Sequence, residues 1–143
     1  MPTDTPLLVY AMLSAYCLAG CLMEHFAVFS GWPAVGSGQL STVQRIQGHG
    51  SGIVYVLPKL ALTVLPIVLL AATPAGVPAW SLWASLIALT ISWLSSAIIQ
   101  IPLQLHIRRT ADPQAVKRLQ RTDWIRVLAM VAHVTFATIA VAA

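Results

Sequence analysis

Apolar residues occur in four long stretches that are separated by more polar connections. The stretches cover roughly residues 7–29, 51–72, 79–106 and 123–143. Each reaches the ~20 residues that a helix needs to cross a ~30 Å hydrocarbon core. Because backbone groups in lipid must pair with one another, helices are the economical way for so short a chain to cross. The pattern therefore predicts an all-α fold: a single transmembrane domain over 1–143, folded as an up-down four-helix bundle.

The composition supports a lipid environment. Hydrophobic residues make up 58% of the chain and charged residues only 8%, whereas soluble domains contain about 25% charged residues. The net charge of +4 does not indicate a nucleic-acid partner, because basic and aromatic residues do not interleave on a soluble face. The expected partner is the lipid bilayer.

The distribution of basic residues predicts the orientation. Six of the eight lysines and arginines lie within residues 106–126, whereas the connection between the second and third stretches carries no charge. The positive-inside rule then places residues 106–126 in the cytoplasm and both termini on the non-cytoplasmic side. The location we expect is a bacterial inner membrane.

The first connection, around "SGWPAVGSGQLSTVQRIQGHGSG", is expected on the same cytoplasmic side. Its "STVQRIQ" segment predicts a short amphipathic helix in the membrane interface, capped by Ser41 and with Val43 and Ile46 facing inward. The following "GHGSG" is expected to be flexible.

Two charged residues lie deep in the predicted spans. Glu24 is the only glutamate of the chain and sits in the oily string "CLMEHFAVF", while Lys59 lies in the second span. A charge at the bilayer centre costs at least ~2.5 kcal/mol, so such residues usually face the interior and pair. We expect Glu24 and Lys59 to pair within a polar chamber between the helices. A pair that only fixes helix register is the alternative.

Gln100 and His133 fall on the same predicted layer, and further polar residues lie on the same helix stripes. Asp123, Arg126 and His133 recur along one stripe of the fourth span, and Gln100 and Gln104 are four residues apart on the third. Gln100 and Gln104 also fit a role as interhelical hydrogen-bond partners. The candidate catalytic residues are Glu24, Lys59, Arg126 and His133, and the candidate substrate-binding residues are Tyr55, Gln100, Gln104 and Asp123.

The four histidines belong to four different predicted helices. Helix bundles build metal sites from facing helices, and imidazole suits iron and copper. The candidate ligands are His49, His133 and Glu24, with His25 the weakest because it points about 100° away from Glu24. His106 points away from Gln100 and is expected in the membrane interface. Iron, copper, a haem on His133, or no cofactor at all remain open, as does a structural role for any one histidine.

The stretch "QIPLQLHIRRTADPQAVKRLQRTDWIR" resembles the small four-helix membrane proteins of the anthrone oxygenase-like family. That family has a Pro-Leu-Asn/Gln motif at the end of the third span, an Asp-Pro-rich basic linker and a Trp that opens the fourth. The segments "FAVFSGWPAV" and "VQRIQG" are also similar. Gln104 replaces the commoner Asn, and the histidine comes later than usual. The matching residues are Pro102, Leu103, Gln104, Asp112, Pro113 and Trp124, with Arg126 and His133 beyond them.

The resemblance implies the four-helix fold and oxygen-dependent oxidation of a lipophilic aromatic compound. The leading hypothesis is thus a membrane oxidoreductase, oxygenase-like, that acts on a hydrophobic aromatic or quinone-like substrate in the chamber. A second hypothesis is a protein that binds or transports a lipid, quinone or other small molecule. A third is an accessory subunit of a membrane complex. A homo-oligomer is compatible with each of them.

Overall fold

The computed structural model describes residues 4–143, except for the side chains of Asp4 and His49. In this range the chain is helical without any strand, which confirms the all-α prediction. The segments η1, η3 and η4 are π-helical turns and η2 is a 3₁₀ turn. The elements are α1 (Asp4–Met23), η1 (Glu24–Phe29), η2 (Trp32–Ala34), α2 (Ser37–Ser51), η3 (Gly52–Val56), α3 (Leu57–Ala71), α4 (Ala79–Ser95), η4 (Ser96–Gln100), α5 (Ile101–Thr110) and α6 (Pro113–Ala142).

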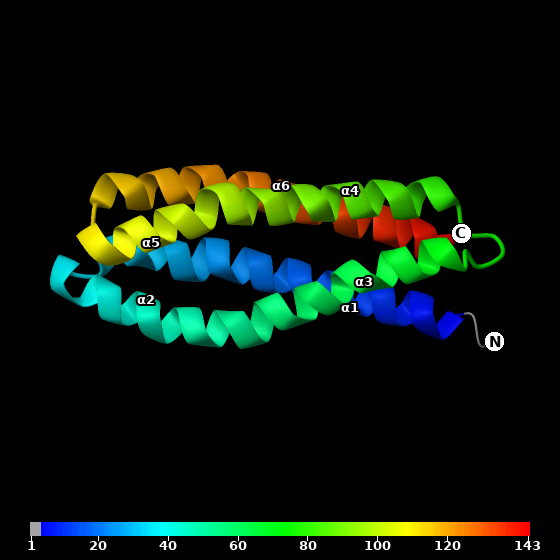
Figure 1. Cartoon of the computed structure of the whole chain (residues 1–143), viewed down its shortest axis with the longest axis horizontal. Helices are drawn as coiled ribbons and strands as arrows, with labels where there is room; N and C mark the ends of the chain where they lie inside the picture. The colour runs from blue at the N-terminus through cyan, green and yellow to red at the C-terminus, as the bar shows by residue number, and fades with distance from the viewer. Residues whose placement is uncertain (1–3) are drawn as a thin grey trace.

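These elements join into four long helices that are each long and apolar enough to cross a membrane. They contain 30 to 35 residues, which corresponds to about 45–53 Å at 1.5 Å per residue. This exceeds a ~30 Å hydrocarbon core, so their ends extend beyond it. Each helix packs against two others: α1 and α4 both contact α3 and α6. Figure 1 shows that α1 begins and α6 ends at the same end of the molecule.

The first connection differs from the prediction. Residues 37–71 form one continuous helix through α2, η3 and α3, so neither a separate interfacial helix nor a flexible glycine segment is present. Ile46 is 68% exposed, whereas Leu40 and Gln44 are buried. The expectation for Ile46 was therefore wrong. In a membrane, helical glycines would keep their backbone groups paired within the helix.

The basic connection is also mostly helical. The helix through α5 ends at Thr110 and α6 begins at Pro113, so the predicted boundaries at 106 and 123 fall inside helices. Only Ala111 and Asp112 form the turn. Ala111 has a left-handed backbone with φ of 50°, and the Asp112 side chain accepts a hydrogen bond of 2.9 Å from the backbone N–H of Gln114. This cap and the proline after it start α6 early.

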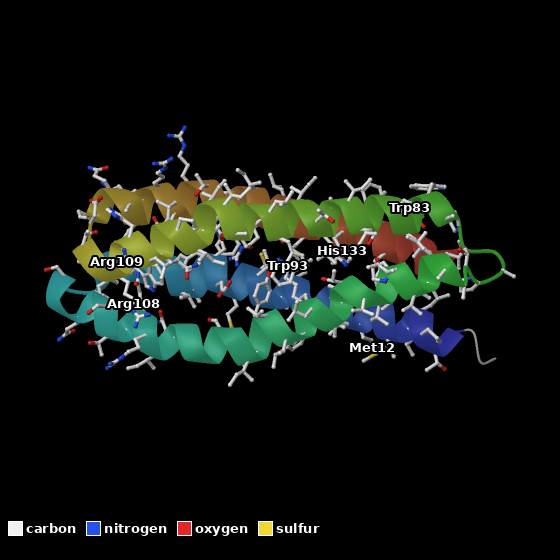
Figure 2. All side chains as sticks on the ribbon, in the orientation of Figure 1. Met12, Trp83, Trp93, Arg108, Arg109 and His133 are labelled. Carbon is white, nitrogen blue, oxygen red and sulfur yellow. The ribbon has the colours of Figure 1, made fainter. Side chains whose placement is uncertain are left out.

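Small side chains allow α4 and α6 to approach closely. Along α4 a buried stripe of serine and alanine recurs at helical spacing, and it faces alanines of α6. Close packing of small residues is a common means of helix association in lipid. Large apolar side chains, including Met12 and Trp83, lie on the outside, as Figure 2 shows. The buried small residues are Ser81, Ser85, Ala88, Ser92 and Ser95 on α4, with Ala115, Ala129, Ala137 and Ala140 on α6.

Two apolar clusters fill the interior at different levels. The larger contains Leu62, Leu89 and Met130 and lies toward the end where α1 begins. The smaller contains Phe29 and Leu119 and lies toward the basic turn.

The strained turn at Ala111 generates a stability prediction. Left-handed backbone costs a residue with a Cβ roughly 1–2 kcal/mol, and glycine avoids that cost. We expect Ala111→Gly to raise the free energy of unfolding by about 1 kcal/mol, measured by denaturation in detergent micelles. The control is Ala61→Gly at an exposed position of α3, where glycine should destabilise. Equal effects of the two substitutions would contradict the role assigned to the turn.

Candidate functional site

A chamber of about 250 Å³ opens between the four long helices. Each of the four helices contributes to its walls, which together contain aromatic, amide and charged side chains. It lies on the side where α2 faces α5, and Arg108 stands at the end nearest the basic turn. The lining residues are Glu24, Val28, Phe29, Trp32, Gln44, Gln47, Gly48, Ser51, Gly52, Tyr55, Val56, Lys59, Trp93, Ser96, Gln100, Ile101, Gln104, Leu105, Arg108 and Arg126.

All three π-helical turns contribute to the chamber walls. Glu24 belongs to η1, Tyr55 to η3 and Gln100 to η4. A π turn widens the helix locally and is frequent at functional sites. The turns η3 and η4 each lie just before a proline, Pro58 and Pro102. Because proline lacks an N–H and its ring crowds the carbonyl four residues earlier, it disturbs the regular ladder at that point.

Contacts from α1 hold η3 in place. The carbonyl of Val54, four residues before Pro58, accepts a hydrogen bond of 2.9 Å from the hydroxyl of Tyr16. A Cβ at Gly20 would lie 3.0 Å from Cδ2 of Tyr55. The absence of a side chain at Gly20 therefore lets the Tyr55 ring pack directly against α1.

A buried cluster of charged groups forms one wall. Nη1 of Arg126 donates to Oε2 of Glu24 at 2.5 Å, and Nη2 donates to Oδ2 of Asp123 at 3.2 Å. Nε of Arg126 also lies 2.8 Å from Oδ1 of Asp123, an ion pair without hydrogen-bond alignment. Nδ1 of His25 is 2.9 Å from Oδ2 of Asp123. The cluster ties η1 to α6.

The predicted pairing of Glu24 with Lys59 is wrong, because Glu24 pairs with Arg126. The planar guanidinium can engage two carboxylates at once, which an ammonium group does less well. Lys59 extends instead to α4, where its Nζ donates to the hydroxyl of Ser92 at 2.7 Å.

Lys59 is a buried cation in an aromatic setting. It is 1% exposed, and its Nζ lies 4.5 Å from the centroid of the Trp93 ring and 5.4 Å from that of Tyr55. Within the described part of the chain it forms no ion pair with a carboxylate. Trp93, visible between the helices in Figure 2, is fixed by a 2.9 Å hydrogen bond from its indole N–H to the hydroxyl of Thr63.

Two polar atoms on the chamber wall lack a hydrogen-bond partner among the described residues. They are Nε2 of Gln44 and the hydroxyl of Tyr55, and both side chains are buried. Buried polar groups in proteins are nearly always hydrogen-bonded. Both residues line the chamber, where a bound molecule can supply a missing partner.

His133 lies outside the chamber. Its Nε2 is 3.1 Å from the hydroxyl of Ser14, and its Nδ1 is 2.9 Å from the hydroxyl and 3.0 Å from the carbonyl oxygen of Ser85. The edge of its ring faces Tyr10, which also hydrogen-bonds to Ser85. Figure 2 shows it inside the bundle, further than Trp93 from the basic end. These contacts fit the alternative that His133 has a structural role, because both of its ring nitrogens have partners within the bundle.

Neither His25 nor His106 joins His133. His25 borders a separate surface hollow with Lys117, Arg121 and Trp124. The side chain of His106 is 53% exposed, with Nε2 3.6 Å from Oδ2 of Asp112. The side chain of His49 lies outside the described residues. Among those that are described, no three His, Cys, Asp or Glu side chains are grouped so that they could hold a metal ion.

The structure brings most of the other candidates together. Glu24, Tyr55, Lys59, Gln100, Gln104 and Arg126 all line the chamber, and Asp123 stands behind Arg126. The Gln100 amide is engaged by the protein: Nε2 donates to the carbonyl of Thr122 at 3.3 Å, and Oε1 accepts from the hydroxyl of Ser95 at 3.1 Å. Gln100 therefore also serves as an interhelical link.

Sequence reasoning missed three prominent wall residues: Gln44, Gln47 and Trp93. The sequence does contain a pattern that could have identified Gln44. Gln44, Gly48, Ser51, Tyr55 and Lys59 recur at i, i+4, i+7, i+11 and i+15, which is one face of a continuous helix. The stripe is recognisable only when "GHGSG" is treated as helical.

Comparison of the chain with protein-family models, with curated proteins and with solved structures finds no match.

The charged cluster yields a test. Breaking a buried ion pair by neutralising one partner leaves an uncompensated charge and costs about 3–5 kcal/mol. We expect Asp123→Asn to lower the free energy of unfolding by about 3 kcal/mol in detergent micelles. The control is Asp112→Asn, where asparagine remains a good helix cap and stability should hardly change. A loss no larger than that of the control would show that the cluster does not stabilise the fold.

Proposed function

We propose that this chain is an integral membrane protein whose chamber takes up a small hydrophobic molecule, aromatic or quinone-like in shape. The observation that carries the proposal is the convergence of three π-helical turns on one chamber with unpartnered polar atoms in its wall. Irregular helix geometry is costly and tends to persist where a site requires it.

The chamber walls suit a flat ligand. Phe29, Trp32, Tyr55 and Trp93 provide aromatic surface, while amide and charged groups lie among them. Ligand sites typically combine an apolar lining with a few placed polar groups, and drug-sized ligands occupy about 300–1,000 Å³. A chamber of about 250 Å³ therefore suits a molecule of one to three small rings, with any longer tail extending into the membrane.

The membrane arrangement completes the proposal. The chain would form an up-down bundle in a bacterial inner membrane, with the α5–α6 turn in the cytoplasm, because arginine and lysine gather at that end. Figure 2 shows Arg108 and Arg109 at the end of the bundle where the α5–α6 turn lies. Since Arg108 also lines the chamber, the ligand would enter from the cytoplasmic leaflet.

A second candidate function is oxidation of such a ligand. It is favoured by Glu24, Tyr55, Lys59 and Arg126, which bring a carboxylate, a hydroxyl and two cations to the same space. These groups suit proton removal and oxyanion stabilisation. The similarity of the third and fourth spans to the anthrone oxygenase-like family supports the same activity.

Ligand uptake can be tested by filling the chamber. Gly52 lines it, and a Cβ there would meet no atom within 4 Å. We expect Gly52→Leu to weaken binding of menadione by about tenfold, which corresponds to 1.4 kcal/mol, because leucine would occupy ligand volume. Binding is measured by quenching of tryptophan fluorescence in lipid nanodiscs.

The matched control is Gly50→Leu on the same helix. Gly50 is equally open but does not line the chamber, so this variant should bind as the unaltered chain does. Equal quenching of both variants would place the bound quinone elsewhere and reject the proposed site.

The oxidoreductase candidate has its own assay. Anthrone and O₂ are supplied to the protein in nanodiscs, and formation of anthraquinone and water, one of each per O₂, is followed by absorbance. A positioned base contributes about 10²–10⁴-fold, so Glu24→Gln should lower turnover by about 100-fold while Asp112→Asn retains it. Production at the uncatalysed rate by the unaltered protein would reject this function and leave the binding proposal standing.

A further inference from the structure

The charged groups around the chamber are unequally partnered. Both carboxylates of the charged cluster have a cation beside them: the half-buried Glu24 contacts Arg126, and the buried Asp123 contacts both Arg126 and His25. Lys59 contacts a serine hydroxyl and two aromatic rings instead. The cation deepest in the wall is thus the one without an acid among the described residues.

The Tyr55 ring lies between two cations. Its centroid is 5.4 Å from Nζ of Lys59 and 5.6 Å from Cζ of Arg126. Aromatic faces attract cations, but they do not neutralise them. The charge of Arg126 is compensated by Glu24 and Asp123, whereas Lys59 has no carboxylate at contact distance among the described residues, so an anion beside Lys59 would compensate its charge.

Lys59 still has unused hydrogen-bond donors. An ammonium group has three N–H donors and no acceptor, and one of these is used on Ser92. The Tyr55 hydroxyl, four residues away on the same helix, has no hydrogen-bond partner among the described atoms. A complementary ligand group must accept hydrogen bonds and, by the charge argument, carry negative charge.

We infer that the chamber selects an anionic aromatic molecule, whose carboxylate or phenolate oxygen lies at Nζ of Lys59 and whose ring packs against Trp93. This inference rests on the proposed function, because it names the ligand class of the same chamber. Trp93 is already held by Thr63, so the aromatic surface is preorganised and little ordering cost remains for binding.

The test compares two ligands of one shape. 2-Naphthoate carries a carboxylate and 2-naphthamide a neutral amide, and each is titrated into the protein in phosphatidylcholine nanodiscs with tryptophan fluorescence as readout. Hydrogen bonds to charged groups are the stronger ones, so 2-naphthoate should bind at least about tenfold more tightly. Equal affinity, or preference for 2-naphthamide, would overturn the inference.

Variants of Lys59 assign the preference to one residue. Lys59→Met keeps a long apolar stem without the charge and should abolish the preference for 2-naphthoate, while 2-naphthamide binding changes little. Lys59→Arg keeps the charge and should retain the preference for 2-naphthoate. A preference that persists in Lys59→Met would assign anion recognition to another group and contradict the inference, and should that variant not fold, the two-ligand comparison in the unaltered chain still decides.

The chamber-filling variant separates this inference from the proposed function. If Gly52→Leu weakens both naphthalene ligands, the chamber binds them, and only their relative affinity judges the charge preference. If Gly52→Leu affects neither ligand and Gly50→Leu behaves the same, the chamber is not the binding site, and the proposed function fails together with the inference.

Discussion

The pairing of Arg126 with two carboxylates is the interaction on which the arrangement of the interior depends. In a low-dielectric setting a charge needs a counter-charge at contact distance. Because Asp123 is one turn from Arg126 and Glu24 reaches it from the neighbouring helix, the guanidinium fixes the rotation and height of η1 against α6. Both deep carboxylates are occupied by this contact. The electrostatic character of the chamber follows, since its other buried cation is left facing aromatic rings.

The chamber exists because the bundle is packed in two ways. At one level, serines and alanines of α4 meet alanines of α6, and the backbones can approach closely. At the other level, π-helical turns widen three helices, and bulky residues such as Trp32 and Trp93 stand between them. The prolines after η3 and η4 make regular packing more costly there. The same helices are therefore closely packed where the small residues of α4 and α6 lie and leave a chamber at the level of the π-helical turns.

Hydrophobic periodicity was sufficient to predict the fold class and the four apolar helices, because lipid leaves few other solutions. Depth along the spans also placed Glu24, Lys59 and Gln100 at one level, and all three line the chamber, whereas His133, placed in the same layer, does not. What failed was the pairing of these residues. Spacing gives the level and face of a side chain but not its reach, and Arg126 reaches Glu24 while Lys59 turns to Ser92.

Two other errors have definite physical causes. Glycine is a turn signal in water, but "GHGSG" remains helical here, and the extended stripe that includes Gln44 and Tyr55 was lost with that assignment. His133 shares a helix face with Arg126, yet it lies seven residues, or about 10 Å, further along α6. At that level serines of α1 and α4 form hydrogen bonds with the imidazole of His133. The position of a residue on a helix face does not reveal which groups of neighbouring helices lie beside it.

The position of Asp123 and Arg126 on one helix has a consequence for biosynthesis. A segment that carries its own counter-ion one turn away can leave the translocon with its charge already compensated. The segments with Glu24 and Lys59 have no such provision, since residues 5–34 contain no lysine or arginine and residues 37–71 no acid. The glutamate acquires its ionic partner only when the last span has been made. Early insertion intermediates would thus carry an uncompensated acid in the first span until synthesis of the C-terminal helix completes the membrane domain.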